Sequence, residues 1–301
     1  MNLEVVQLDK SFSGKKAVES ITLSVESGKI HGLLGSNGAG KTTFMKLLSG
    51  IYRPDDGCVY FSGAPIYGNT EIKSQVMFIS DHPYFLNGKT LLSMAEFYRA
   101  VYPRWSSTRF SQLAHHFGLD LHQPLSQFSK GMKRQATFVL AYSSRPKVLL
   151  LDEPFDGLDP IIRRQVKDIM MQDITNHGMM VIISSHNLRE MEDICDSISM
   201  MHEGKLLFHS NLNEVRGTHF KLQIAFDVLP TESFFKDVDV VHHEIRGRVV
   251  TCIVKGDRYD IERKITKYRP LMYDILPLSL EEIFAYEMGE RGYAISDITI
   301  E

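Results

Sequence analysis

The chain has 301 residues, of which 43% are hydrophobic, and a formal net charge of −3. This hydrophobic content is typical of globular proteins and is sufficient for two packed cores, which excludes a disordered or fibrous chain. The near balance of 34 basic and 37 acidic residues lacks the basic excess of general nucleic-acid binders, so we expect no nucleic-acid partner. The three cysteines form neither a disulfide framework nor a CxxC metal motif, which favours a reducing compartment.

The sequence predicts neither a signal peptide nor a membrane span. Met1 leads directly into the charged, alternating stretch 2–10. The longest apolar runs are far shorter than the ~20 residues that a membrane-spanning helix needs. We therefore expect a soluble protein, whose role at a membrane would have to come through a partner.

Four short apolar runs occur in the first two-thirds of the chain, and none alternates with polar residues. They are Ile30–Leu34, Val76–Ile79, Val148–Leu151 and Met179–Ile183. Such runs are typical of strands covered on both faces in a parallel sheet. Helical stretches separate them, and the first carries an apolar stripe of Phe44, Leu47, Leu48 and Ile51. The alternation of strands and helices predicts a layered α/β domain.

Two further regions differ in composition from this strand series. Residues 82–145 are rich in helical patterns and aromatic side chains, which predicts a helical subdomain inserted into the α/β domain. Residues 217–301 are more acidic, and the alternation in 221–226 and 249–254 predicts a small α+β domain. We therefore expect a first domain over 1–216 and a C-terminal accessory domain over 217–301.

A glycine-rich loop directly follows the first predicted strand. Residues 35–42 read GSNGAGKT and match the pattern G-x-x-x-x-G-K-[ST] between a strand and an amphipathic helix. Glycines allow successive backbone N–H groups to face phosphate oxygens, and the helix adds its positive N-terminal dipole. Lys41 would reach the β- and γ-phosphates, and the Thr42 hydroxyl would ligate Mg²⁺. The residues expected to bind the nucleotide here are Gly35, Ser36, Asn37, Gly38, Ala39, Gly40, Lys41, Thr42 and Thr43.

Two acidic residues, Asp152 and Glu153, end the third apolar run. A carboxylate at the end of a buried strand can hold the Mg²⁺ shell, which suits Asp152. Glu153 is placed to orient and polarise the attacking water. A plain strand followed by a solvated turn gives the same pattern, so the prediction depends on its combination with the glycine-rich loop.

A histidine follows the fourth apolar run, at the end of Ser184-Ser185-His186. Histidines after strands are usually structural. Ligands of open parallel sheets, however, bind at the carboxyl ends of the strands, where the loop and the Asp-Glu pair are also expected. We therefore predict that His186 donates a hydrogen bond to the γ-phosphate and holds the water geometry.

With these motifs the chain resembles the nucleotide-binding subunits of ATP-binding cassette (ABC) transporters. Residues 128–132 read FSKGM, a variant of the family's LSGGQ signature that is similar to those of bacterial exporters. By itself Ser129 would be a plain N-cap of a helix over 131–141. The resemblance extends over residues 1–216. It implies a P-loop cassette with a mostly parallel core sheet, an antiparallel β subdomain and an inserted helical subdomain.

The resemblance also implies a dimer. In this family two cassettes pair head to tail, so that ATP would lie between 35–42 of one subunit and Ser129, Lys130 and Gly131 of the other. Asp159 matches the loop that communicates across this interface. Phe12 matches the aromatic residue that stacks on adenine, although a core phenylalanine of the first hairpin fits the same position.

One position departs from the family pattern. The family usually has a glutamine after the second strand, where it touches Mg²⁺ and the attacking water, whereas Asp81 stands there in this chain. A carboxylate can ligate Mg²⁺, but it adds negative charge beside the γ-phosphate. We expect Asp81 to slow hydrolysis or alter coupling without abolishing activity. A loop aspartate outside the site is the alternative.

The predicted function is ATP hydrolysis by a cassette dimer that powers export of an unidentified substrate through a separate transmembrane permease. ATP and Mg²⁺ are the expected cofactors, and the location is the cytoplasmic face of the cell membrane, peripheral through the permease. Residues 277–284 look like the C-terminal stretch of export-type cassettes. The alternative is a nucleotide-dependent switch, or a low-activity subunit that binds ATP and regulates partners without driving transport.

Overall fold

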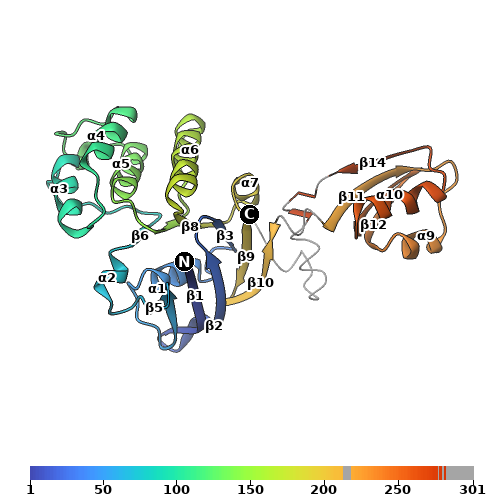
Figure 1. The fold of residues 1–301 in the computed structure, drawn as a ribbon, viewed down its shortest axis with the longest axis horizontal. Helices are drawn as coiled ribbons and strands as arrows, with labels where there is room; N and C mark the ends of the chain where they lie inside the picture. Colours follow the sequence, from blue (N-terminus) through green and yellow to red (C-terminus); the bar gives the residue numbers. More distant parts are fainter. Residues whose placement is uncertain (213–217, 277, 280, 283–301) are drawn as a thin grey trace. The chain divides into compact units, whose positions relative to one another are not determined.

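The computed structural model describes residues 1–212, 218–276, 278–279 and 281–282 (Figure 1). The described chain forms two compact units. The first contains residues 1–187 and 198–207, and the second contains residues 188–197 and the described residues from 208 onward. The domain boundary expected between residues 216 and 217 stays a prediction.

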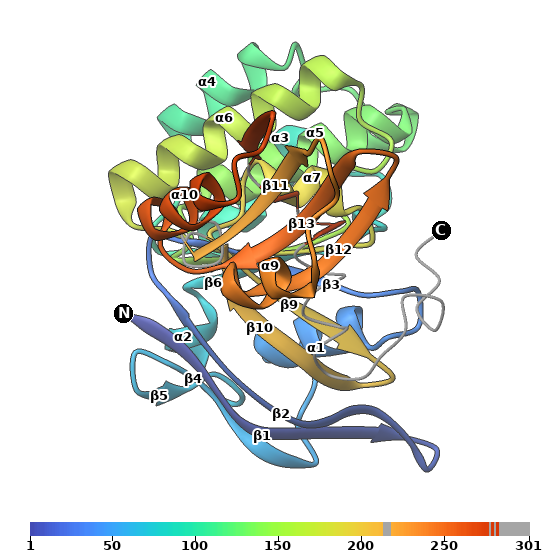
Figure 2. The same ribbon diagram turned by 90° about the vertical axis from the view of Figure 1, so that its right-hand side faces the viewer.

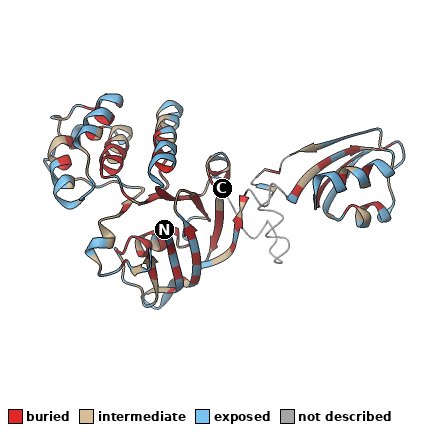
Figure 3. Cartoon of the chain, viewed as in Figure 1, coloured by how far each residue is buried: buried red, intermediate tan, exposed pale blue. Residues whose placement is uncertain are grey.

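A six-stranded sheet, in the order β10-β9-β3-β8-β7-β6, lies mostly in the first unit. Its strands are β3 (Ile30–Leu34), β6 (Val76–Ile79), β7 (Val148–Asp152), β8 (Met180–Ser185), β9 (Ser197–His202) and β10 (Lys205–Asn211). The pairs β3–β8, β8–β7 and β7–β6 are parallel. Every residue of β3, β7 and β8 is buried (Figure 3), which confirms the prediction of doubly covered parallel strands.

Strand β8 differs from its predicted bounds. It begins one residue later than expected and continues through Ser185, because Ser184 pairs with Asp152 of β7 and Ser185 pairs with Leu34 of β3. The two serines therefore belong to the sheet and not to a loop after it.

Helix α1 (Lys41–Leu48) packs between the six-stranded sheet and a second, antiparallel sheet. The strand order of the antiparallel sheet is β2-β1-β4-β5. Its strands are β1 (Asn2–Phe12), β2 (Lys15–Glu26), β4 (Asp56–Phe61) and β5 (Ala64–Pro65). One core cluster joins Leu3 of β1, Phe44 of α1 and Leu150 of β7, and Figure 2 shows α1 between β1 and β3. The predicted stripe is wrong at Ile51, which lies beyond the end of α1 and is 52% exposed.

The remaining helices of the first unit lie mostly in the region 82–145. They are α2 (Thr70–Lys73), α3 (Leu91–Val101), α4 (Ser107–His116), a 3₁₀ turn (Leu125–Gln127), α5 (Lys130–Ser143) and α6 (Pro160–His177). The N-caps Thr90, Ser106, Ser129 and Asp159 each accept a hydrogen bond from a backbone N–H of the first turn of their helix, which explains where α3, α4, α5 and α6 begin. An ion pair between Arg109 and Asp173, at 2.7 Å, ties α4 to α6.

The second unit is a small α+β structure, as the alternation in the sequence predicts. Its elements are α7 (Leu188–Glu192), β11 (His219–Ala225), α9 (Glu232–Asp237), β12 (Val240–Arg246), β13 (Val249–Lys255), α10 (Arg258–Lys267) and β14 (Met272–Leu276). The four strands pair antiparallel in the order β12-β13-β11-β14. Phe234 of α9 and Ile261 of α10 pack with Leu222 of β11 and Val250 of β13, so both helices cover the same face of the sheet.

Among the described residues, no helix combines the length and the apolar character that crossing a bilayer requires. The stretch 277–284 was predicted to be similar to the ends of export-type cassettes. Its residues 277, 280, 283 and 284 lie outside the described part of the chain.

Candidate active site

The loop 35–42 connects β3 to α1, and its backbone requires glycine at two positions. Gly35 and Gly40 have φ angles of +154° and +104°. A Cβ atom at Gly35 would lie 2.4 Å from the carbonyl oxygen of Met201, and one at Gly40 would lie 2.3 Å from that of Ala17. A real Cβ does not approach an oxygen this closely. Glycine is therefore required at both positions by the adjacent strands as well as by the backbone conformation of the turn.

A cavity of about 950 Å³ opens beside this loop, at the upper end of the ~300–1,000 Å³ typical of small-molecule sites. All of its lining residues belong to the first unit. They are Phe12, Lys15, Lys16, Ala17, Ser36, Asn37, Gly38, Ala39, Gly40, Lys41, Thr42, Thr43, Asp81, Asp152, Glu153, His202, Glu203 and Gly204. The structure therefore brings the glycine-rich loop and the Asp-Glu pair, which are far apart in sequence, to one pocket.

The ammonium group of Lys41 is held at the base of this pocket. Its Nζ donates to the carbonyl oxygens of Gly35 at 2.6 Å and Ser36 at 3.3 Å, and lies 3.7 Å from Glu153 Oε1. Burial lowers the pKa of Lys41, while the negative charges of Glu153 and Asp152 act in the opposite direction. Phosphate oxygens would add further negative charge and would also favour the protonated lysine.

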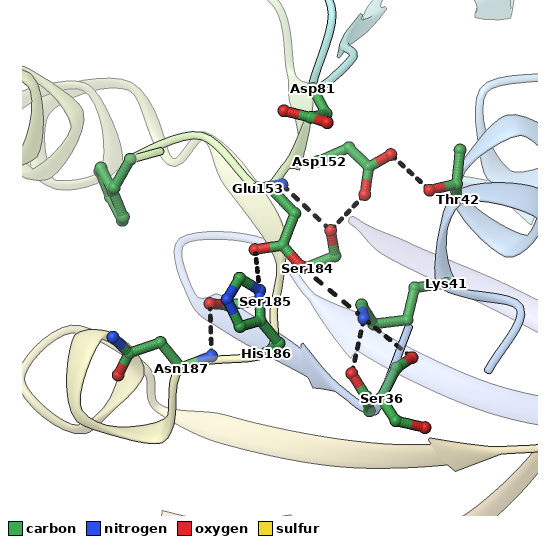
Figure 4. A network of polar contacts seen from close by, with 12 residues as sticks. Ser36, Lys41, Thr42, Asp81, Asp152, Glu153, Ser184, Ser185, His186 and Asn187 are labelled. Atoms are coloured by element: carbon green, nitrogen blue, oxygen red, sulfur yellow. Dashed lines mark hydrogen bonds and ion pairs between the residues drawn. The ribbon is translucent and has the colours of Figure 1, made fainter. Parts of the chain in front are cut away.

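Asp152 connects the loop helix to the central sheet. Its Oδ2 accepts a hydrogen bond from the Thr42 hydroxyl at 2.7 Å, and its Oδ1 accepts one from the Ser184 hydroxyl at 2.5 Å (Figure 4). Among the described residues, no group of three or more His, Cys or acidic side chains forms a metal cluster. Mg²⁺ usually takes one or two protein oxygens and completes its shell with water and phosphates. The oxygen pair of Thr42 and Asp152 fits that kind of site.

The backbone of Glu153 is unusually constrained. Its φ is +45°, a left-handed conformation that is uncommon for a residue with a side chain. The Glu153 N–H donates to Ser184, and the Glu153 carbonyl accepts from Arg134 Nη1 at 3.0 Å. The carboxylate points to His186, whose Nδ1 lies 3.0 Å from Glu153 Oε2 (Figure 4). The structure thus places His186 beside the predicted catalytic carboxylate.

Phe12 lies at the edge of the pocket. Its ring contacts that of Tyr52 edge-on, with centroids 5.5 Å apart, and the side chain is 44% exposed. The residue is therefore not a fully buried core phenylalanine. Its stacking on adenine stays a prediction.

Six residues of the predicted site do not line the pocket. Gly35 and His186 contact lining residues, Lys41 and Glu153 respectively. Ser129, Lys130, Gly131 and Asp159 lie elsewhere. Ser129 caps α5 by accepting from Met132 N–H at 3.2 Å. Asp159 Oδ1 caps α6 and accepts two backbone N–H groups at 3.0 Å. Within one chain these residues are helix caps, and their contact with a partner's nucleotide stays a prediction.

Asp81 lines the pocket, and both of its carboxylate oxygens have partners. Oδ1 accepts from Arg134 Nη2 at 3.1 Å, and Oδ2 lies 2.8 Å from Nδ1 of the exposed His82. The predicted contact of Asp81 with Mg²⁺ stays a prediction.

Two parts of the pocket lining were not anticipated from the sequence. One is Lys15, Lys16 and Ala17 of β2. The other is the turn at 202–204 between β9 and β10, whose Gly204 N–H donates to Ala39 O at 2.9 Å. The Glu-Gly pair between two apolar segments was an available turn signal.

Arg134, which follows the signature, was expected either to meet phosphate or to lie on a solvated helix face. The structure instead buries it on α5 and pairs it with Asp81 and the Glu153 carbonyl, outside the pocket lining.

Comparison with known proteins identifies the family. The family model for the ABC transporter matches residues 18–156. The ABC transporter ATP-binding protein YtrB of Bacillus subtilis (strain 168) is 27% identical over 96% of this chain and 99% of its own length. The lantibiotic transport ATP-binding protein SrtF of Streptococcus pyogenes is 31% identical over 75% of this chain and 98% of its own length. A solved structure described as the ATP-binding subunit of an ABC transporter matches with a TM-score of 0.67 and 28% identity, over 72% of this chain and 92% of that one. This chain belongs to the ATP-binding subunits of ABC transporters, and it is an ATPase.

Proposed function

We propose that this ATPase acts as one of two cassettes that close on ATP at the cytoplasmic face of the membrane and drive export of a substrate through a separate transmembrane permease. The one-sided nucleotide pocket carries this proposal. It is lined by residues 36–43 and the pair Asp152–Glu153, whereas Ser129, Lys130 and Gly131 are not part of it. A second cassette that presents residues 129–131 would complete the site, because a helix N-terminus favours phosphate.

In this proposal the loop and Lys41 bind the triphosphate. Backbone N–H groups of 35–42 face its oxygens, and the ammonium of Lys41 neutralises charge on the β- and γ-phosphates. Thr42 and Asp152 would hold Mg²⁺, which would supply positive charge to the phosphate oxygens. Ser184 fixes the second oxygen of Asp152 through its 2.5 Å hydrogen bond and so orients the carboxylate.

Glu153 receives the proton of the attacking water. Its backbone is held by Ser184 and Arg134, which fixes the point from which the side chain extends. His186, 3.0 Å from this carboxylate, orients the Glu153 side chain through Nδ1 and directs its other ring nitrogen to the γ-phosphate. The water then attacks phosphorus in line with the leaving oxygen of ADP.

The relatives support the transport role. YtrB is described as the ATP-binding protein of an ABC transporter, and SrtF as a lantibiotic transport ATP-binding protein. Both are matched over nearly their whole length, which supports an equivalent subunit in a complex with a permease. Export as the direction rests on the FSKGM form of the signature at 128–132.

ATP-dependent pairing provides the first test. With MgATP, the slowly hydrolysing variant Glu153→Gln should form a dimer, seen as a doubling of mass in light scattering. Glu96→Gln, which changes an exposed glutamate of α3, is the matched control and should form little dimer, because it continues to consume ATP. A Glu153→Gln protein that binds ATP but stays monomeric at all concentrations would contradict the dimer.

Purification of the tagged full chain from membranes provides the second test. The proposal predicts a stoichiometric multi-span membrane protein, whose addition in liposomes stimulates ATP hydrolysis. Recovery with ribosomes or DNA and without a membrane protein would favour the nucleotide-dependent switch.

A further inference from the structure

We propose that Arg134 is a positioning residue for ATP hydrolysis. It acts by holding two groups at once, the carboxylate of Asp81 and the backbone carbonyl of Glu153. The inference rests on the proposed catalytic role of Glu153 and extends it to a residue outside the nucleotide pocket.

The burial of Arg134 is the first observation. The residue lies on α5, in the second turn after the Ser129 cap, and is only 1% exposed. An arginine this deeply buried needs partners for its guanidinium, because an unpaired buried charge is strongly unfavourable. Its partners come from two other segments of the first unit, the loop after β6 and the turn after β7.

The contact with Glu153 is the second observation. Arg134 Nη1 donates to the Glu153 carbonyl at 3.0 Å, while Ser184 accepts from the Glu153 N–H. The backbone is therefore fixed on both sides of a residue with a φ of +45°. Without Arg134 this carbonyl would lose its charged donor, and the Glu153 backbone would be less firmly held, since Ser184 fixes only the N–H side. A loss of alignment of about 1 Å can cost about 10²-fold in rate.

The contact with Asp81 is the third observation. Arg134 Nη2 donates to Asp81 Oδ1 at 3.1 Å, and the Asp81 side chain is 34% exposed at the pocket (Figure 4 shows Asp81 near Asp152 and Glu153). The guanidinium compensates a negative charge that would otherwise repel the γ-phosphate. In this arrangement Asp81 acts as the partner of Arg134 and not as a Mg²⁺ ligand.

The planar shape of the guanidinium is needed for both contacts. Its two Nη atoms reach acceptors on different segments, 53 and 19 residues away in the sequence. A lysine keeps the charge but places it at a single point. Arg134 therefore links the orientation of α5, whose N-terminus is proposed to touch the partner's ATP, to the position of the catalytic carboxylate.

Steady-state ATP hydrolysis by Arg134→Ala, Arg134→Lys and wild type tests the proposal. Arg134→Ala should lower kcat by about ten- to a hundredfold and change KM for ATP by less than about threefold, since the pocket loop is untouched. Arg134→Lys should lie between the two. Arg99→Ala, which removes an exposed arginine from α3, should keep the wild-type kcat. Each rate is expressed per folded molecule, measured by the fluorescence of the single tryptophan, Trp105.

Rescue separates positioning from simple destabilisation. Arg134→Ala removes the guanidinium from Asp81 Oδ1 and leaves only His82 near Oδ2, so the added change Asp81→Asn, which removes the carboxylate charge beside the phosphates, should restore part of kcat. Asp81→Asn alone keeps an oxygen acceptor for Arg134 and should leave the Mg²⁺ concentration for half-maximal activity unchanged. An increase of about tenfold in that concentration would assign Asp81 to the metal and overturn its proposed role as the partner of Arg134.

Two results would contradict the role of Arg134 itself, namely a wild-type kcat in Arg134→Ala or a loss confined to KM. If Arg134→Ala does not fold, Arg134→Lys replaces it in the test. The role of Arg134 would then be contradicted if Arg134→Lys had the wild-type kcat and the added change Asp81→Asn made no difference to it. The proposed function fails separately, if the wild type does not hydrolyse ATP or if Glu153→Gln is as fast as wild type.

Discussion

The two units of the chain differ in how tightly their strands and turns are packed. In the first unit the strands β3, β7 and β8 are buried along their whole length, and the groups for chemistry lie at their carboxyl ends. There a Cβ atom at Gly35 or Gly40 would collide with a backbone oxygen. Glu153 is left-handed, as Asp239 and Arg269 of the second unit also are. In the second unit one face of the sheet packs on helices, and a Cβ atom at the turn glycine Gly247 would meet nothing within 4 Å.

This difference shows where function is concentrated. A buried polar group such as Asp152 is tolerated because Thr42 and Ser184 satisfy it, and the same contacts prepare it for a metal. The described core of the second unit consists of apolar side chains such as Phe234 and Val250, which stabilise a fold without preparing a reaction. Changes in the first unit should therefore affect chemistry before stability, and changes in the second should affect stability first.

The largest expected effect is on chemistry. Glu153→Gln removes the proposed general base and should lower kcat by about 10³-fold, within the roughly 10²–10⁴ range for such groups, while ATP still binds. Glu244→Gln changes an exposed glutamate of β12 in the second unit and serves as the control. Measured ATP turnover that is equal for Glu153→Gln and wild type would refute Glu153 as the catalytic carboxylate.

A core truncation in the second unit should have the largest effect on stability. Phe234 is fully buried, and its ring lies 5.0 Å from that of Tyr268 and 5.4 Å from that of Phe226. Phe234→Ala should cost about 3–5 kcal/mol of unfolding free energy in this unit and leave ATP turnover near wild type. The exposed Phe97 of α3 provides the control Phe97→Ala, which should cost less than about 1 kcal/mol.

Alkylation of Cys252 reports on that unit directly. Burial raises the pKa of the Cys252 thiol to about 12, so the reactive thiolate is scarce at neutral pH. Its alkylation rate should rise with pH toward that value, since the thiolate fraction grows about tenfold per pH unit below the pKa. Phe234→Ala should expose the thiol and accelerate the reaction at about pH 7.5. If Phe234→Ala also changes the fluorescence of Trp105 in the first unit, the two units unfold together. The contrast between a chemical and a structural unit would then be wrong.

A pair of glycine substitutions should give a smaller contrast. Gly40→Ala combines a φ of +104° with a Cβ 2.3 Å from a backbone oxygen, and should cost about 2 kcal/mol or more and weaken ATP binding. Gly247→Ala has a φ of +62° and open space, so only the left-handed conformation costs energy, about 1 kcal/mol. Thermal unfolding and titration with a fluorescent ATP analogue measure both. Equal losses in the two variants would show that the close packing around Gly40 relaxes.

The smallest expected effect comes from two matched helix caps. Asp159 caps α6 and Asp257 caps α10, and each accepts two backbone N–H groups through Oδ1. Each change to alanine should cost about 1 kcal/mol. Only Asp159→Ala should also lower ATP turnover, because Asp159 is proposed to contact the second cassette. A turnover that is unchanged by Asp159→Ala would leave it with the capping role alone.

Much of the fold was predictable, because its signals are local. The four apolar runs appear as strands of one sheet, with β3 and β6 at their predicted bounds. The error at Ile51 has a local cause. The apolar period continues through Ile51, but α1 ends at Leu48 and Gly50 adopts a φ of +68°, a helix C-terminal signal that outweighs the period.

The candidate site was predictable only in part. Lys41, Thr42, Asp152 and Glu153 could be grouped in advance, because parallel strands bring their carboxyl ends to one edge of a sheet. Their meeting in one pocket agrees with that expectation, whereas their catalytic roles stay predictions until the variants are measured.

The fold class, the phosphate loop and the family follow from the amino-acid sequence, since each depends on residues that are neighbours in the chain or that share a strand end. Three features appear only in the folded chain: Arg134 is buried, its guanidinium joins Asp81 to the Glu153 carbonyl, and Phe12 stays half-exposed at the pocket. These features depend on how α5, β1 and the segments after β6 and β7 pack, and packing between distant segments leaves no periodic trace in the sequence.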